Sequence, residues 1–148
     1  MIKIIFLLFA FVSFCSMANN FDLPIVNSKK INDECSISFD GNIVSKHNCE
    51  YESPSFLRFY SLIPYSWSSL WVFQDAPWGN ACEGGAIRII SMDSHSKIRI
   101  HPLIDYCSGK ISILNADDKV EIKIFSKGGE VEIWIFDGEK LSKTKSSL

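Results

Sequence analysis

Two short segments separated by a glycine-containing turn decide the fold: Lys119–Phe125, KVEIKIF, and Glu130–Phe136, EVEIWIF. In both segments an aliphatic residue occupies every second position, and most of the residues between are charged. Successive side chains of a strand point to opposite faces, so a period of two predicts half-buried antiparallel strands. Lys127-Gly128-Gly129 between the segments then forms the turn of a hairpin.

The same alternation continues outward from this hairpin. Ile98 and Ile100 alternate with polar residues, and turn-forming sequences such as Ser108-Gly109-Lys110 recur about every ten residues. We expect an antiparallel meander of about five strands from Ala86 to Phe136. The sequence therefore predicts an all-β, single-domain protein that forms a small sandwich or a partly open barrel.

The stretch Pro54–Trp78 is unusually aromatic and is interrupted by three prolines. Leu70–Phe73 is expected to be a strand, whereas Phe56–Ile63 fits either a strand or one short helix. A small β domain needs large side chains to fill its core, which favours a core role for these aromatics. The alternative is a surface that stacks on sugars or anchors a protein partner. Trp78 is the best candidate for such a surface.

The first eighteen residues have the pattern of a secretory signal. Lys3 is followed by an apolar run, Ile4–Phe14, and then by Ser16-Met17-Ala18, which is typical of a signal peptidase site. The run has eleven residues, and a membrane-spanning helix needs about twenty. We expect cleavage after Ala18; a retained anchor, or a lipoprotein processed at Cys15, is the alternative.

These features divide the chain into four parts. A cleaved signal peptide (1–18) precedes an irregular lead-in (19–34), a β domain (35–139) and a flexible tail (140–148). The chain without its first eighteen residues has 14 basic and 17 acidic residues and no basic patch, which argues against a nucleic-acid partner. We expect a secreted or periplasmic bacterial protein with no membrane span after cleavage.

Four of the five cysteines follow the predicted signal, and an even number in a small exported domain predicts two disulfides. Cys35 and Cys49 flank the turn Asp40-Gly41-Asn42, offset by one or two residues from direct opposition. In a hairpin centred between Ser94 and His95, the residue numbers of each facing pair add up to 189. The numbers of Cys82 and Cys107 also add up to 189, so these two cysteines are expected to face each other. Facing Cα atoms lie about 4.5–5.5 Å apart, which suits a disulfide. The predicted bonds are Cys35–Cys49 and Cys82–Cys107.

The segment Asp75–Gly85, DAPWGNACEGG, contains the densest group of conformationally special residues. Loops on rigid β scaffolds often carry recognition, so this segment is our candidate binding loop. The alternatives are a tight turn whose glycines serve geometry alone, or a cation site, although the spacing matches no EF-hand loop. We predict no metal or cofactor. The candidate binding residues are Trp78, Asp75, Asn80 and Glu83.

Nothing in the sequence predicts catalysis. No nucleophile elbow, zinc-protease motif or phosphate-binding glycine loop occurs. The histidines His47, His95 and His101 are expected at the surface, since acid–base chemistry would need a positioned partner beside them. We therefore expect a protein that is not an enzyme and name no catalytic residue.

Gly79-Asn80-Ala81-Cys82-Glu83-Gly84-Gly85, Asp105-Tyr106-Cys107-Ser108-Gly109 and Trp134-Ile135-Phe136-Asp137-Gly138 together resemble a pattern of small uncharacterised exported bacterial β proteins. The resemblance spans Leu70–Leu141. It supports the Cys82–Cys107 bond and implies no known activity.

Architecture and compartment together favour non-catalytic binding, with a protein as partner, in the manner of an inhibitor or an immunity-type protein. A rigid, stapled domain loses little entropy on binding. The alternatives are an envelope module that binds glycans through exposed aromatics, and a hydrolase with a site the sequence does not reveal.

Overall fold

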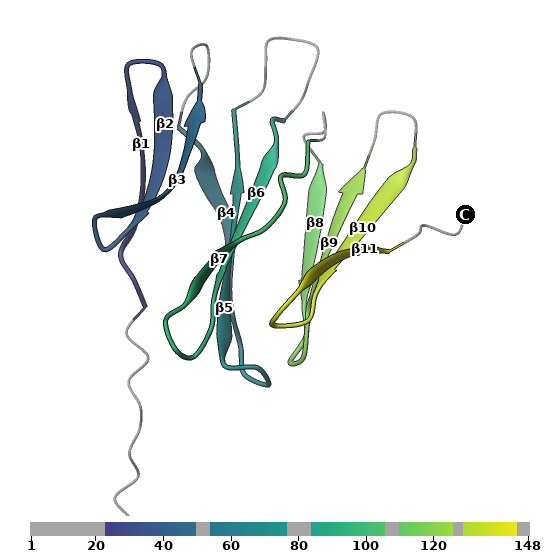
Figure 1. Cartoon of the computed structure of the whole chain (residues 1–148). Helices are drawn as coiled ribbons and strands as arrows, with labels where there is room; N and C mark the ends of the chain where they lie inside the picture. The colour runs from purple at the N-terminus through teal and green to yellow at the C-terminus, as the bar shows by residue number, and fades with distance from the viewer. Residues whose placement is uncertain (1–22, 50–53, 77–83, 106–109, 126–128, 145–148) are drawn as a thin grey trace, which may run out of the picture.

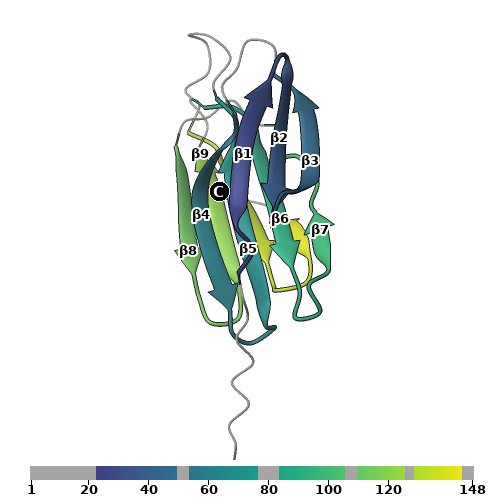
Figure 2. The ribbon, with the colours of Figure 1, turned by 90° about the vertical axis from the view of Figure 1, so that its left-hand side faces the viewer.

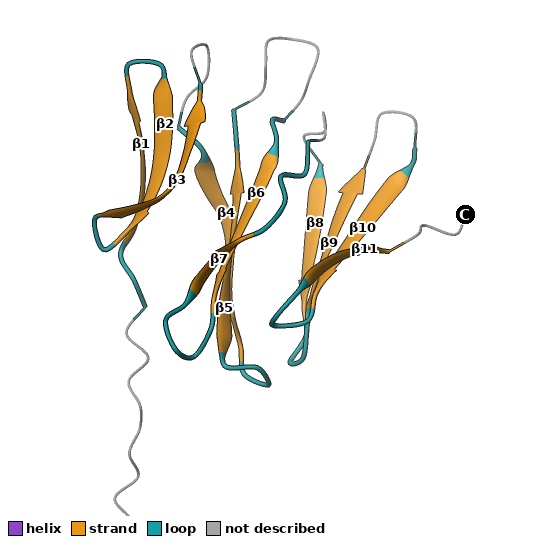
Figure 3. Ribbon diagram, in the orientation of Figure 1, coloured by secondary structure: helices purple, strands orange, loops and turns teal. Residues whose placement is uncertain are grey.

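The computed structural model describes residues 23–49, 54–76, 84–105, 110–125 and 129–144. The strands lie in three antiparallel sheets in which sequence neighbours pair (Figure 1). Figure 3 shows strands and loops but no helix in this part of the chain, and so no described helix is long and apolar enough to cross a membrane. The described strands are β1 (Val26–Ile31), β2 (Glu34–Phe39), β3 (Asn42–Asn48), β4 (Phe56–Ile63), β5 (Ser68–Gln74), β6 (Ile87–Met92), β7 (Ile98–Ile100), β8 (Ile111–Asn115), β9 (Val120–Phe125), β10 (Val131–Phe136) and β11 (Leu141–Thr144).

The sheets are stacked as three layers (Figure 1). We call them the first sheet, with order β1-β2-β3, the middle sheet, β4-β5-β6-β7, and the third sheet, β11-β10-β9-β8. In the described part of the chain all three sheets are open, so the predicted all-β antiparallel architecture is confirmed as a sandwich. A third layer was not foreseen.

The centre of the middle sheet is buried on both faces, and β5 shows this most clearly. Leu70 and Val72 pack toward the third sheet, whereas Trp71 and Phe73 pack toward the first. Every residue of β5 is buried. An apolar run without alternation is what a strand covered on both faces requires, so the run Leu70–Phe73 marks the central strand of the molecule.

Two separate cores result from this arrangement. One lies between the middle and third sheets and is built mainly from isoleucine, valine and leucine, with Phe136. The other lies between the first and middle sheets and is more aromatic: the rings of Phe39 and Trp71 have centroids 4.7 Å apart, and those of Tyr60 and Trp71 5.3 Å. The expectation that aromatics fill the core is confirmed for Trp71 and Phe73.

Several predicted boundaries need correction. The lead-in 19–34 contains β1 and the start of β2, because backbone pairing with β2 makes a strand of the polar sequence Val26–Ile31. The tail 140–148 begins with β11, where Leu141 is buried against the core. Phe56–Ile63 is strand β4, not a helix.

The predicted five-strand meander is present, but it does not form one sheet. Strands β6 and β7 complete the middle sheet, and β8, β9 and β10 belong to the third. The chain crosses between layers after β7, near the isolated bridge between Ile87 and Ile104. Alternation along each strand is local information, whereas the layer to which a strand belongs is set by packing between distant residues.

The register of the β6–β7 hairpin differs by one residue from the prediction. Ser91 faces Arg99, so facing numbers total 190 rather than 189. The amide of Ser96 bonds the carbonyl of Asp93, and Ser96 adopts a left-handed φ of 61°. This is a three-residue turn, which places one residue more in the loop than a symmetric two-residue turn does. The geometric basis for Cys82–Cys107 is weakened accordingly; both cysteines lie outside the described residues.

The disulfide Cys35–Cys49 is confirmed, with a Cα–Cα distance of 5.7 Å. Cys35 faces His47 across β2 and β3, and Cys49 follows two residues later, as the predicted offset requires. Both cysteines are buried. A buried disulfide is typical of proteins that fold in an oxidising compartment.

Candidate functional site

The turn between β4 and β5 presents the most exposed large aromatic side chains of the described residues. It comprises Pro64-Tyr65-Ser66-Trp67, and we call it the aromatic turn. Tyr65 is 83% exposed and Trp67 64%. Trp67 also has a left-handed φ of 49°, and its amide bonds the carbonyl of Pro64. A left-handed conformation costs a residue with a Cβ roughly 1–2 kcal/mol, so neither the exposure nor the backbone of Trp67 serves stability.

The aromatic turn is held in place by the neighbouring β10–β11 turn. Ser66 Oγ lies 2.7 Å from Ser68 Oγ. A Cβ on Gly138 would lie 2.0 Å from Ser66 Oγ, and Gly138 has a φ of +96°. Glycine is therefore required at 138 both by its conformation and by the close approach of Ser66. The aromatic turn is therefore packed closely against the β10–β11 turn.

A cavity of about 240 Å³ lies beside the aromatic turn. Its walls come from three turns at the same end of the molecule, those between β4 and β5, β6 and β7, and β10 and β11. Arg99 donates a hydrogen bond to the carbonyl oxygen of Glu139, which links the middle sheet to the third. The cavity carries charges of both signs and is lined by Ser66, Ser91, Asp93, Lys97, Arg99, Gly138 and Glu139.

A serine–histidine contact lies at the wall of this cavity. Ser91 Oγ is 2.8 Å from His101 Nε2, and the ring of His101 meets Phe136 edge-on. Burial, and then the charge of Arg99, lower the pKa of His101 below 6.5. Among the residues that the structure describes, His101 forms no ion pair. The contact satisfies two buried polar groups, which is the common role of such a pair in a core.

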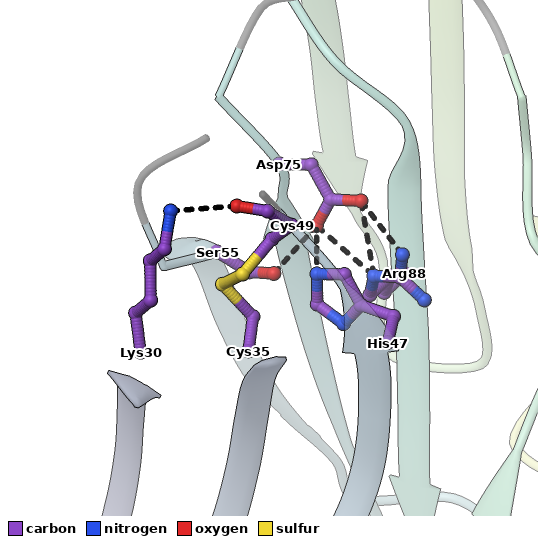
Figure 4. Close-up of a disulfide and its surroundings, with 7 residues drawn as sticks. All are labelled: Lys30, Cys35, His47, Cys49, Ser55, Asp75 and Arg88. Atoms are coloured by element: carbon purple, nitrogen blue, oxygen red, sulfur yellow. Dashed lines mark hydrogen bonds and ion pairs between the residues drawn. A yellow bond between two sulfur atoms is a disulfide. The ribbon is translucent and has the colours of Figure 1, made fainter. Parts of the chain in front are cut away.

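A second buried polar cluster lies between the first and middle sheets (Figure 4). Two guanidinium nitrogens of Arg88 donate hydrogen bonds to the carboxylate oxygens of Asp75, with N–O distances of 2.8–3.1 Å. Ser55 Oγ donates to the same carboxylate. His47 Nε2 lies 3.6 Å from Asp75. Burial and the charge of Arg88 lower the pKa of His47 from 6.5, and Asp75 opposes them. Neither ring nitrogen of His47 has a hydrogen-bond partner among the described residues.

This cluster and the Ser91–His101 contact bear on two expectations. Asp75, a candidate binding residue, is 4% exposed with its carboxylate engaged, so it anchors the base of its loop. His47 and His101 lie in the interior, and only His95 is exposed as expected. Trp78, Asn80 and Glu83 lie outside the described residues.

The aromatic turn was missed by sequence reasoning, which gave these aromatics to the core as a group. Pro64 was the available signal, because a proline ends a central strand and the residues after it belong to a turn. Tyr65 and Trp67 therefore had no ladder to join. In the described ranges no three His, Cys, Asp or Glu side chains are placed to hold a metal ion.

Comparisons with protein-family models, with curated proteins and with solved structures gave no match.

Proposed function

We propose that this chain is a non-catalytic binding protein of the inhibitor or immunity type, and that it recognises a protein partner through the aromatic turn. The observation that carries the proposal is the exposure of Tyr65 and Trp67 on a turn that packs through Ser66 against Gly138. Tyrosine, tryptophan and arginine dominate the binding energy of protein interfaces. A rigid platform also lowers the entropy lost on binding.

The surroundings of the turn favour a protein over a glycan. Lys97, Arg99, Asp93 and Glu139 line the adjacent cavity and give it charges of both signs. An interface with a central aromatic anchor and a charged rim matches the anatomy of protein–protein contacts. Neutral sugars would make little use of four ionised groups.

Export forms part of the proposal. The sequence of residues 1–18 and the buried disulfide Cys35–Cys49 both support an oxidising compartment outside the cytoplasm. The intact mass of protein recovered from the periplasm or medium should correspond to a chain beginning at Asn19, without titratable thiols. Non-reduced peptide mapping should recover Cys82 linked to Cys107; a mass that retains residues 1–18 would contradict the proposal of cleavage.

Two substitutions of Trp67 test the binding site. Trp67→Ala should reduce capture of the partner from an envelope extract at least tenfold, about 1.4 kcal/mol. Trp67→Gly should do the same without loss of stability, since glycine tolerates the left-handed backbone. Ile43→Ala is the control and should retain binding. Ile43 lies on the first sheet and is 49% exposed.

The outcomes separate the candidate functions. A protein retained by the parent and by Ile43→Ala, but lost with both Trp67 variants, supports the proposal. Binding to purified cell-wall polysaccharide, with no protein captured and with the same dependence on Trp67, would replace it by the glycan alternative. Undiminished capture by Trp67→Gly would show that the aromatic turn is not the site.

A further inference from the structure

The middle sheet has a long edge strand whose outer backbone edge pairs with no other described strand. Strand β4 has eight residues, pairs only with β5 among the described strands, and forms one edge of its sheet. In Figure 2, β4 lies on the same side of the molecule as β1 and β8, the edge strands of the other two sheets. The unpaired N–H and C=O groups of an edge strand form a template for another extended chain.

The other sheet edges carry lysines or are short, whereas β4 is long and has no lysine. Lysines occur on β1, β3 and β11, and β7 and β8 have only three and five residues. Short length and edge lysines are the common devices that prevent strand addition. Strand β4 has one charged residue, Arg58, and exposes Phe56, Leu57 and Leu62.

The geometry of β4 limits where a partner chain can pair. The β4–β5 register shifts between Leu57 and Phe59, so a bulge lies near the start of the strand. A bulge locally disrupts regular pairing. The regular part of the edge is therefore Phe59–Ile63, which leads directly into the aromatic turn.

The charges on this side of the molecule indicate what kind of chain would pair there. Strands β1, β4 and β8 contain Lys29, Lys30 and Arg58 and no acidic residue, although the whole chain has a net charge of −2. A second copy paired edge to edge through β4 would bring together two sides of the molecule whose edge strands carry positive charges only. A segment with carboxylates would instead meet opposite charges.

We propose that β4 accepts an extended, acidic segment of the protein partner, which pairs along Phe59–Ile63 as a fifth strand of the middle sheet. This inference rests on the proposed function, because the added strand would bring the partner to Tyr65 and Trp67. Backbone pairing would supply affinity along β4, and the aromatic turn would anchor the body of the partner.

A phage-displayed library of random linear decapeptides provides the probe. Selection on the mature protein should enrich peptides rich in Asp and Glu and in β-forming residues. In hydrogen exchange, a synthetic peptide of this set should slow exchange within β4 and leave β7 and β11 unchanged. Leu62→Lys and Arg58→Glu should each weaken its binding at least tenfold.

Leu114→Lys is the matched control, since Leu114 is an exposed leucine on the edge strand β8 of the neighbouring sheet. It should leave peptide affinity unchanged within about twofold. Circular dichroism and thermal melting identify any variant that fails to fold. Arg58→Glu, at an exposed position, remains informative if Leu62→Lys does not fold.

Three results would overturn the inference. They are the absence of any selected peptide, protection of strands other than β4, and a concentration-dependent dimer that Leu62→Lys abolishes. Loss of the natural partner with Trp67→Gly, but not with Leu62→Lys or Arg58→Glu, would retain the aromatic turn as the site and remove β4 from it. Loss of the natural partner with the β4 variants, but not with Trp67→Gly, would retain β4 as the site and remove the aromatic turn from it.

Discussion

At the scale of single residues, the buried Asp75–Arg88 ion pair should stabilise the protein more than the exposed Glu34–Lys46 pair. Asp75→Ala should lower the free energy of unfolding by about 3 kcal/mol, because it leaves Arg88 without its carboxylate between two sheets. Glu34→Ala removes the partner of Lys46 at the surface, where both side chains are about half exposed, and should cost less than about 1 kcal/mol. Urea unfolding of both variants measures the difference, and equal losses would contradict this account of the cluster.

His47 and His101 make stability depend on pH. Burial lowers the pKa of both below 6.5, so protons bind more readily to the unfolded chain. Their contribution is complete above pH 6.5 and is lost as the pH falls from there through the lowered folded-state pKa values. The urea concentration at the midpoint of unfolding should therefore decrease as the pH is lowered from 7.5 to 5.

The double variant His47→Gln, His101→Gln should flatten the stability profile in this range. Asp93 and Asp137 provide a separate signal at lower pH. Backbone amides hold their carboxyl pKa values below 3.8, so their contribution disappears only in stronger acid. A profile unchanged by the double substitution would rule out the histidines as its cause.

At the scale of elements, Gly138 tests how two turns position the aromatic platform. Gly138→Ala places a Cβ against Ser66, whereas Gly41→Ala meets no atom within 4 Å; both glycines have positive φ. Gly41→Ala should cost about 1–2 kcal/mol from backbone conformation alone. Gly138→Ala should cost more, and Ser66→Gly in the same chain should recover the excess. Denaturant unfolding of this cycle isolates the contact between the turns, and equal costs at 41 and 138 would show that it is absent.

The elements also show how far sequence reasoning reached. Alternation identified β9 and β10, and the Asp40-Gly41 turn with its flanking cysteines predicted the hairpin and its disulfide. These signals are local. The role of Trp71 between two layers and the burial of His47 beside Arg88 depend on residues far away in the chain. No periodicity within those segments could have predicted them.

At the scale of the whole molecule, the middle sheet should be the most stable unit. Strands β5 and β6 are covered on both faces, whereas β1 and β11 are edges of outer layers. Local opening costs most where burial is greatest, so amides of β5 and β6 should exchange slowest and those of β1 and β11 fastest among the strands. Hydrogen exchange followed by NMR checks this order. Protection of β11 equal to that of β5 would show that the layers open only together.

The stacking order also has a mechanical consequence. The described chain enters at β1 in the first sheet and leaves from β11 in the third, so the middle layer lies between its two ends (Figure 1). A pulling force applied there would be transmitted through the two interfaces between the layers, one after the other. Side-chain packing is short in range, and layers drawn apart across it separate before the ladders within each sheet are sheared. Under tension the protein should therefore yield by parting into sheets, at low force, with each sheet still paired.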